Sequence, residues 1–295
     1  DYRGPMLLTA VLLYAVQLYA DFSGYTDMAV GAAKLLGFTL RENFRAPYFA
    51  TDISGLWTRW HLSLTTWLTD YIFTPLVWSR WYDRLFHKKD WEQRAPSFWA
   101  DILIVFAVSG LWHGAGLTFL VWGLVNGAAR ALEDAAQRRR KQAGRKKKKY
   151  PEFGLVNALK RVWVFVFWAL SLVFFRSATL ADALYIFKNM PTADGAAALV
   201  PQLLHMCTNG ISSSKLYLLL FIVCIAGGIV LMTAFDAEIY RSSLKGQTLC
   251  MNPLGRRRTV PRWLLYWFMG LSTAMFFLIG QSGFGTASQF IYGGF

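Results

Sequence analysis

Two histidines are the residues of this 295-residue chain best suited to moving protons. Imidazole titrates near neutral pH, so histidine can accept or donate a proton under physiological conditions. His113 lies among glycines, between Gly110 and Gly116, inside a long uncharged run. An ionisable residue in such an apolar context is a functional candidate, and burial would leave it as a neutral base. A core histidine bonded to a backbone carbonyl explains the position about equally well.

His61 is the second candidate. If its segment is helical, it shares a face with Leu64 and Thr65. Considered by residue type alone, a histidine at the level of the lipid headgroups is the simpler interpretation. His87 is expected in a solvated loop, and His205 has no evident partner.

A pair of carboxylates, Asp21 and Asp27, interrupts an apolar stretch. Residues six apart do not share a helix face, so the two are not an obvious catalytic dyad. Ser23 and Gly24 between them are expected to break the helix. The carboxylates would then bond freed backbone groups or arginines, which is a structural role.

Common catalytic and metal-binding motifs are absent from the sequence. It has no H-E-x-x-H, no phosphate-binding P-loop and no dinucleotide-binding G-x-G-x-x-G. The segment from Gly280 to Phe284 misses the G-x-S-x-G pattern, and Thr66 stands where a His-x-x-x-x-Asp motif starting at His61 would need aspartate. The three cysteines form no C-x-x-C pair. We therefore expect no metal ion and no permanently bound cofactor.

The elements that carry these residues are expected to be membrane helices. The chain is 55% hydrophobic and only 16% charged, unlike a soluble domain. One apolar run, residues 102 to 129, is too long for a single crossing and is interrupted by glycines, which favours a broken, re-entrant or paired-helix arrangement. Residues 54 to 84 mix aromatic and polar side chains, a pattern typical of interfacial helices. The other apolar runs are 6–20, 28–38, 162–175, 216–235 and 263–280.

Positive charge is concentrated in one segment. The net charge is +14, and ten basic residues against two acidic ones fall between Arg130 and Lys149. This pattern predicts a basic cytoplasmic loop at about residues 131–160 and no nucleic-acid partner. Lys146 to Lys149 could touch anionic lipid headgroups, but a solvated loop is the simpler interpretation. We therefore expect deletion of Arg138 to Lys148 to cost little activity.

Several motifs occur in one order along the chain. Together they resemble the membrane-bound O-acyltransferases, and within that family the alginate O-acetylase branch. The match covers almost the whole chain and corresponds to the later portion of a family member. The motifs are D-F-S-G-Y-T-D-M-A from Asp21, E-N-F-R-A-P-Y from Glu42, W-T-R-W-H-L-S-L-T-T-W-L from Trp57, G-L-W-H-G from Gly110 and F-I-Y from Phe290.

The resemblance implies an all-α, polytopic transmembrane helical bundle with re-entrant and interfacial helices around a tunnel. Residues 1–295 would form one membrane domain that lacks its early helices. The implied location is the bacterial inner membrane, which the protein would cross several times in contact with membrane lipid. Acetyl-CoA is the implied cytoplasmic donor, an exported, alginate-like polysaccharide the acceptor, and an extracytoplasmic SGNH-type acetyltransferase the partner.

The resemblance also assigns site residues. His113 matches the signature histidine of the family, and His61 matches a second histidine of the branch. His113 would accept a proton from the attacking hydroxyl, or alternatively carry the acyl group as a nucleophile; His61 or Arg59 would stabilise the oxyanion. The residues expected to bind substrate or line the tunnel are Trp112, Gly114, Arg59, Trp60, Ser63, Asn43 and Asp27.

Two alternatives stay open. A relative that acylates another envelope acceptor, such as peptidoglycan or teichoic acid (by D-alanylation), would carry the same motifs. A transporter or scaffold of polysaccharide export would instead use Asp21, Asp27 and His113 to line a path for the exported chain.

Overall fold

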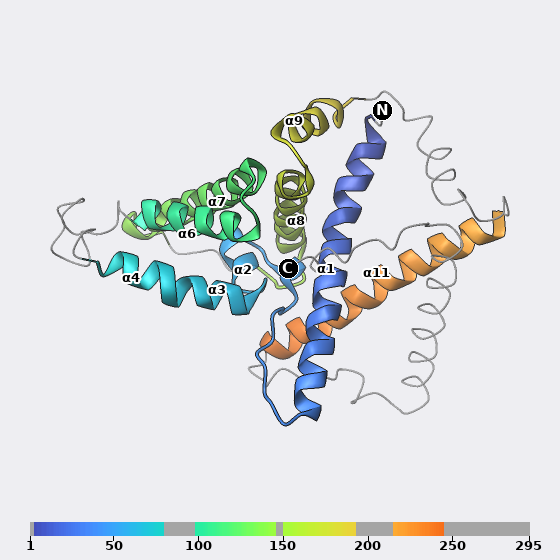
Figure 1. Ribbon diagram of the computed structural model, residues 1–295, viewed down its shortest axis with the longest axis horizontal. Coiled ribbons are helices and arrows are strands. Elements are labelled where there is room, and N and C mark those ends of the chain that lie inside the picture. The colour runs from blue at the N-terminus through green and yellow to red at the C-terminus, as the bar shows by residue number, and fades with distance from the viewer. Residues whose placement is uncertain (1–2, 80–97, 146–149, 193–214, 245–295) are drawn as a thin grey trace.

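The computed structural model describes residues 3–79, 98–145, 150–192 and 215–244, and these are helical with no strand among them (Figure 1). The all-α prediction is therefore confirmed. The long helices are α1 (Pro5–Leu35), α6 (Phe98–His113), α7 (Leu117–Gln142), α8 (Leu155–Arg176) and α11 (Lys215–Leu244). The short elements are η1 (Pro47–Phe49), α2 (Ile53–Trp57), α3 (Leu62–Leu68), the π-helical η2 (Thr69–Phe73), α4 (Thr74–Val77) and α9 (Leu180–Asn189).

Two helices in the described part, α1 and α8, are long and apolar enough to cross a membrane. They lie side by side at the centre of the molecule (Figure 1). The helix break predicted at Ser23 and Gly24 does not occur, because α1 is continuous for 31 residues. One interior glycine costs only about 1 kcal/mol, which the apolar runs on either side can offset. Asp21 and Asp27 consequently meet no freed backbone groups.

Helices α6 and α7 form a tight antiparallel hairpin, as the glycine-interrupted run predicted. Only residues 114 to 116 separate them. A Cβ built on Gly123 would lie 2.2 Å from the carbonyl oxygen of Phe106, and one on Gly110 would lie 2.3 Å from that of Phe119. Small residues therefore let the two backbones touch, as is common between membrane helices.

Helical turns occupy both ends of the basic segment at about residues 131–160, and its place as a cytoplasmic loop stays a prediction. Helix α7 continues to Gln142 and α8 begins at Leu155. Arginine, lysine, glutamine and alanine are good helix formers. Arg138 also pairs with Asp134 one turn earlier on the same helix. Between the two helices, the described residues 143–145 and 150–154 are not helical.

The core is built of aromatic and aliphatic side chains from α1, α2, α7 and α8, with Leu18, Leu56, Trp168 and Leu172 almost fully buried. Helix α11 crosses α1 and is tied to it by the Tyr19 hydroxyl, which donates a 2.7 Å hydrogen bond to Asp236. The predicted helix at 263–280, the F-I-Y motif, His87 and His205 lie outside the described residues.

Candidate active site

His61 occupies a break in the backbone between α2 and α3. Its φ of 45° and ψ of 54° are left-handed, a conformation that costs a non-glycine residue about 1–2 kcal/mol. It therefore precedes α3 as its N-cap, and the helical face predicted with Leu64 and Thr65 does not form. Strained residues of this kind cluster at functional sites.

Asn43 holds this break in place. Its carbonyl oxygen accepts a 3.0 Å hydrogen bond from the backbone N–H of Leu62, and its side-chain oxygen accepts one of 3.0 Å from that of Ser63. The Ser63 hydroxyl in turn lies 3.4 Å from Nδ1 of His61. Asn43 and Ser63, both predicted site residues, thus position the imidazole.

Aromatic rings surround the His61 imidazole. Phe22 lies edge-on at 4.7 Å between ring centroids, and Trp112 at 6.0 Å. His61 belongs to the connection between α2 and α3, outside the two candidate spans. Burial penalises the charged imidazolium and lowers the pKa of His61 from its ordinary 6.5 to about 4. The ring is therefore neutral at physiological pH.

His113 ends α6 and is buried, with 7% of its surface exposed. Its ring contacts those of Trp112, Trp122 and Phe175 at centroid distances of 4.8, 5.3 and 5.0 Å. Nδ1 is fully buried, and in the described part of the chain it has no hydrogen-bond partner. No hydrogen bond from His113 to a carbonyl is recorded among the described residues.

The two histidines line one narrow space, here called the histidine cavity, with Trp57, Leu64 and Trp122 among its other walls. Its volume is about 10 Å³, roughly the room of one water molecule. His61 and His113 are far apart in the sequence, and folding brings both to this one space. A water or a reacting hydroxyl in it would lie beside the side chains of both histidines.

Two wider spaces share lining residues with the histidine cavity. The α1 cavity, of about 300 Å³, shares His61 with it and is also lined by Phe22, Asn43 and Trp112. The α3–α6 cavity, of about 250 Å³, shares Trp57 and Leu64 with it. The histidine cavity therefore shares walls with two wider spaces.

Arg130 is a site residue that sequence analysis missed. It lines the α3–α6 cavity together with hydroxyl groups of α2, α3, η2 and α6. Its Nη1 is buried without a hydrogen bond among the described residues, and Asp134 lies 3.9 Å away. Its position as the first charged residue after the uncharged run of residues 102–129 could have indicated a functional role, but we grouped Arg130 with the basic segment.

The remaining predicted residues divide into two groups. Trp60 lines the histidine cavity, and Trp112 stands between the two histidine rings. Gly114 has a φ of 157°, and a Cβ there would meet the ring of Phe119 at 2.6 Å. Arg59 and Asp27 do not join the site.

Arg59 points away from the histidines. Its Nη1 donates to the carbonyl oxygen of Arg45 at 3.1 Å, and its guanidinium lies over the ring of Tyr240 at 4.9 Å. Asp27 is exposed on α1, and the wall of the α1 cavity is formed by its neighbours Thr26 and Val30. In this arrangement neither side chain faces the histidine cavity.

Comparison with known proteins places these features in a family. Residues 4–179 match the model of the membrane-bound O-acyltransferase family. The chain is 35% identical over 186 residues to a peptidoglycan O-acetyltransferase of Helicobacter pylori, covering 63% of this chain and 32% of that protein. It is 40% identical over 124 residues to a probable alginate O-acetylase of Pseudomonas fluorescens, covering 42% and 23%.

A third relative carries a different acceptor in its name. The chain is 35% identical over 112 residues to a teichoic acid D-alanyltransferase of Bacillus subtilis, covering 38% of this chain and 27% of that protein. The chain thus spans about a third or less of the length of these relatives.

Proposed function

Because the chain belongs to the membrane-bound O-acyltransferase family, we propose that it forms the histidine-bearing part of a membrane enzyme that transfers an acyl group from a thioester to a hydroxyl. The observation that carries this proposal is the histidine cavity. Two imidazoles from distant segments line this cavity, and Nδ1 of His113 is buried without a partner among the described residues. The two wider spaces that share walls with the histidine cavity offer room for a donor and an acceptor.

The proposed reaction is direct acyl transfer. The acceptor oxygen attacks the thioester carbonyl carbon while His113 takes the hydroxyl proton. The C–S bond then breaks, and the proton passes to the departing thiolate, which gives an ester and a thiol. General base catalysis of this kind contributes about 10²–10⁴-fold. Neutral His61, held by Asn43 and Ser63, is placed to donate a hydrogen bond to the developing oxyanion.

Acetyl is the proposed acyl group, with acetyl-CoA as the cytoplasmic donor and an exported polysaccharide as the acceptor. Two of the relatives described above are named as O-acetylating enzymes. We place the protein in a bacterial inner membrane as a multi-pass protein, working with an extracytoplasmic SGNH-type partner. Transfer to peptidoglycan, or of D-alanyl to teichoic acid, is the alternative suggested by the other names.

The test uses the full-length protein in proteoliposomes with radiolabelled acetyl-CoA, its partner and the candidate polymers. His113→Ala is compared with Leu184→Ala, which alters an exposed side chain on α9. We expect His113→Ala to remove transfer at least 100-fold at equal expression and equal melting temperature, and the control to retain it. Full transfer by His113→Ala would refute the proposal and favour a scaffold of polymer export.

A further inference from the structure

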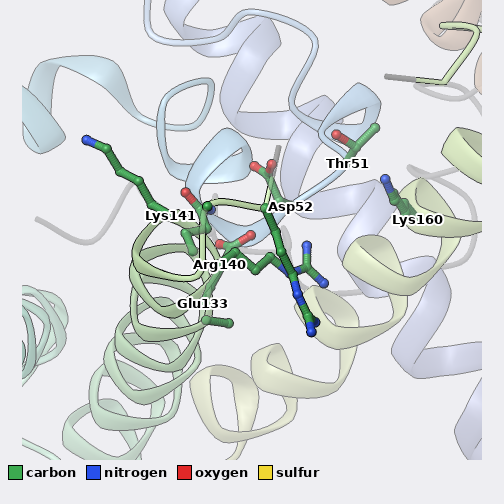
Figure 2. Close-up of a pocket in the computed structure, with 10 residues that line it drawn as sticks. Thr51, Asp52, Glu133, Arg140, Lys141 and Lys160 are labelled. Carbon is green, nitrogen blue, oxygen red and sulfur yellow. The ribbon is translucent and has the colours of Figure 1, made fainter. Parts of the chain in front are cut away.

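The largest described cavity lies away from the histidines, at the basic end of α7 (Figure 2). This basic pocket has a volume of about 660 Å³, within the usual range for small-molecule sites. Arg140 and Lys141 come from the last turns of α7, Lys160 comes from α8, and Thr51 and Asp52 form the wall beside α2 (Figure 2). Arg145 adds a fourth cation from the connection after α7.

The two carboxylates of the basic pocket are engaged with the start of α2. Asp52 caps that helix by accepting a 2.7 Å hydrogen bond from the backbone N–H of Gly55. Glu133 accepts one of 2.8 Å from the backbone N–H of Ser54. Both acids therefore have a structural task, and four cations surround them.

The four cations have no carboxylate partner within the described residues. The ion pairs recorded there involve other arginines, including Arg138 with Asp134 and Arg161 with Glu152. Lys160 makes a different contact, with its ammonium 4.8 Å from the ring centroid of Tyr150. The four cations outnumber the two carboxylates of the pocket, so the concave surface carries a net positive charge that suits an anion with several oxygens, such as a phosphate.

The position of the basic pocket restricts the ligand further. Helix α7 carries Trp122 in the wall of the histidine cavity and Arg140 in the wall of the basic pocket. At ~1.5 Å per residue, these positions are about 27 Å apart along the helix. A small acyl phosphate cannot span that distance, whereas a thioester on a long flexible arm that ends in a diphosphate can approach both sites.

We propose that the basic pocket binds a phosphate-bearing ligand through Arg140, Lys141, Arg145 and Lys160. Two sources share this chemistry: the diphosphate of a nucleotide-linked thioester, and the phosphate headgroup of an anionic lipid. The thioester source rests on the function proposed above, whereas phosphate binding itself does not. The proposal also replaces the expectation that Arg138 to Lys148 can be deleted at little cost.

The experiment measures binding separately from turnover. Full-length protein in detergent is titrated with coenzyme A and with ADP by calorimetry. Arg140→Gln/Lys160→Gln is compared with Arg139→Gln/Lys188→Gln, which removes the same charge at exposed positions outside the pocket. We expect the first double variant to bind coenzyme A and ADP at least about tenfold more weakly than the native protein, and the second to bind them with native affinity. Melting without ligand checks that both variants fold.

A second measurement covers the lipid source. Thermal stabilisation by phosphatidylglycerol is compared with stabilisation by phosphatidylcholine in the same proteins. If the pocket double variant loses binding of coenzyme A and ADP and the control double variant keeps it, the site binds the thioester. If the pocket double variant loses stabilisation by phosphatidylglycerol but still binds coenzyme A and ADP, the site binds a lipid headgroup. If the two double variants behave alike in both measurements, the proposal is overturned.

The same binding assay separates this proposal from the catalytic one. His113→Ala should lose transfer and still bind coenzyme A with native affinity. If His113→Ala transfers acyl groups normally while the pocket variants lose phosphate binding, the proposed catalytic function is refuted and the proposed phosphate site is supported. If His113→Ala is inactive while pocket variants bind phosphates normally, the pocket proposal fails alone.

Discussion

The histidine cavity and the basic pocket share helix α7 but differ in size, polarity and exposure. The first is about 10 Å³, lined by aromatic rings, and holds neutral groups. The second is about 660 Å³, lined by cations on an open surface. Electrostatic contacts are strong in a dry, enclosed space and are screened in an open one. The difference suggests that the first sets the rate of the reaction and the second sets how a ligand is captured.

Kinetics should separate the two regions most strongly. We expect His113→Ala to lower kcat by about 10²–10⁴-fold, because it removes the base from the reacting centre. Arg140→Gln/Lys160→Gln should raise the KM for the thioester about tenfold and leave kcat unchanged, because it weakens binding only. Initial rates over a range of donor concentrations measure both. A pocket variant with lowered kcat and native KM would contradict this division.

The hairpin that links the regions should depend on close backbone contact. Gly123→Ala would place a Cβ 2.2 Å from the carbonyl oxygen of Phe106, so we expect it to lower stability by about 1–3 kcal/mol. Gly24→Ala is the matched control, because nothing lies within 4 Å of its Cβ position in α1. The control should be neutral or stabilising by up to about 1 kcal/mol. Thermal unfolding in detergent compares the two, and equal melting temperatures would show that the contact is unimportant.

Acid should destabilise the region around His61. The pKa of His61 is about 4 in the fold against an ordinary 6.5, so the unfolded chain binds the additional proton between these values. Its contribution to stability is complete above pH 6.5 and decreases as the pH falls towards 4. At pH 5 we expect a loss of about 2 kcal/mol.

His61→Asn provides the control for this pH dependence, since asparagine tolerates the left-handed backbone and does not titrate. Melting temperatures at pH 7 and pH 5 should fall less for His61→Asn than for the native protein. An identical fall in both proteins would mean that His61 does not titrate as inferred.

Raising the salt concentration should give the smallest of the expected differences between the histidine cavity and the basic pocket. Charges at the open basic pocket are screened as ionic strength rises, so the KM for the donor should increase a few-fold between low salt and about 0.5 M. The kcat should stay constant, because the histidine cavity holds no solvent-exposed charge. Initial rates in a salt series measure this, and a falling kcat with constant KM would contradict the assignment.

Much of the architecture could be predicted from residue patterns. The glycines around His113 marked the turn between α6 and α7, and the uncharged runs marked the long helices. Ser23 and Gly24 misled, because helix propensity is a weak term that packing and apolar context override. The charge pattern of the basic segment did not indicate that α7 extends to Gln142.

The site was only partly predictable for physical reasons. The resemblance named His61 and His113, but no local pattern indicates that segments so distant meet at one cavity. The left-handed backbone of His61 has no signature in its residue type, and Asn43 holds it from another segment. Arg59 was misplaced because side-chain direction depends on packing, here on the ring of Tyr240.

The central claim is that His61 and His113 act together in one cavity. A double-mutant cycle tests it most directly, with kcat/KM for acyl transfer measured in the native full-length protein, His61→Ala, His113→Ala and the double variant. Groups that work as a unit are strongly non-additive, so the double variant should be about as slow as His113→Ala alone. If the two losses in kcat/KM simply multiply, the histidines act independently and the shared cavity is not the catalytic centre.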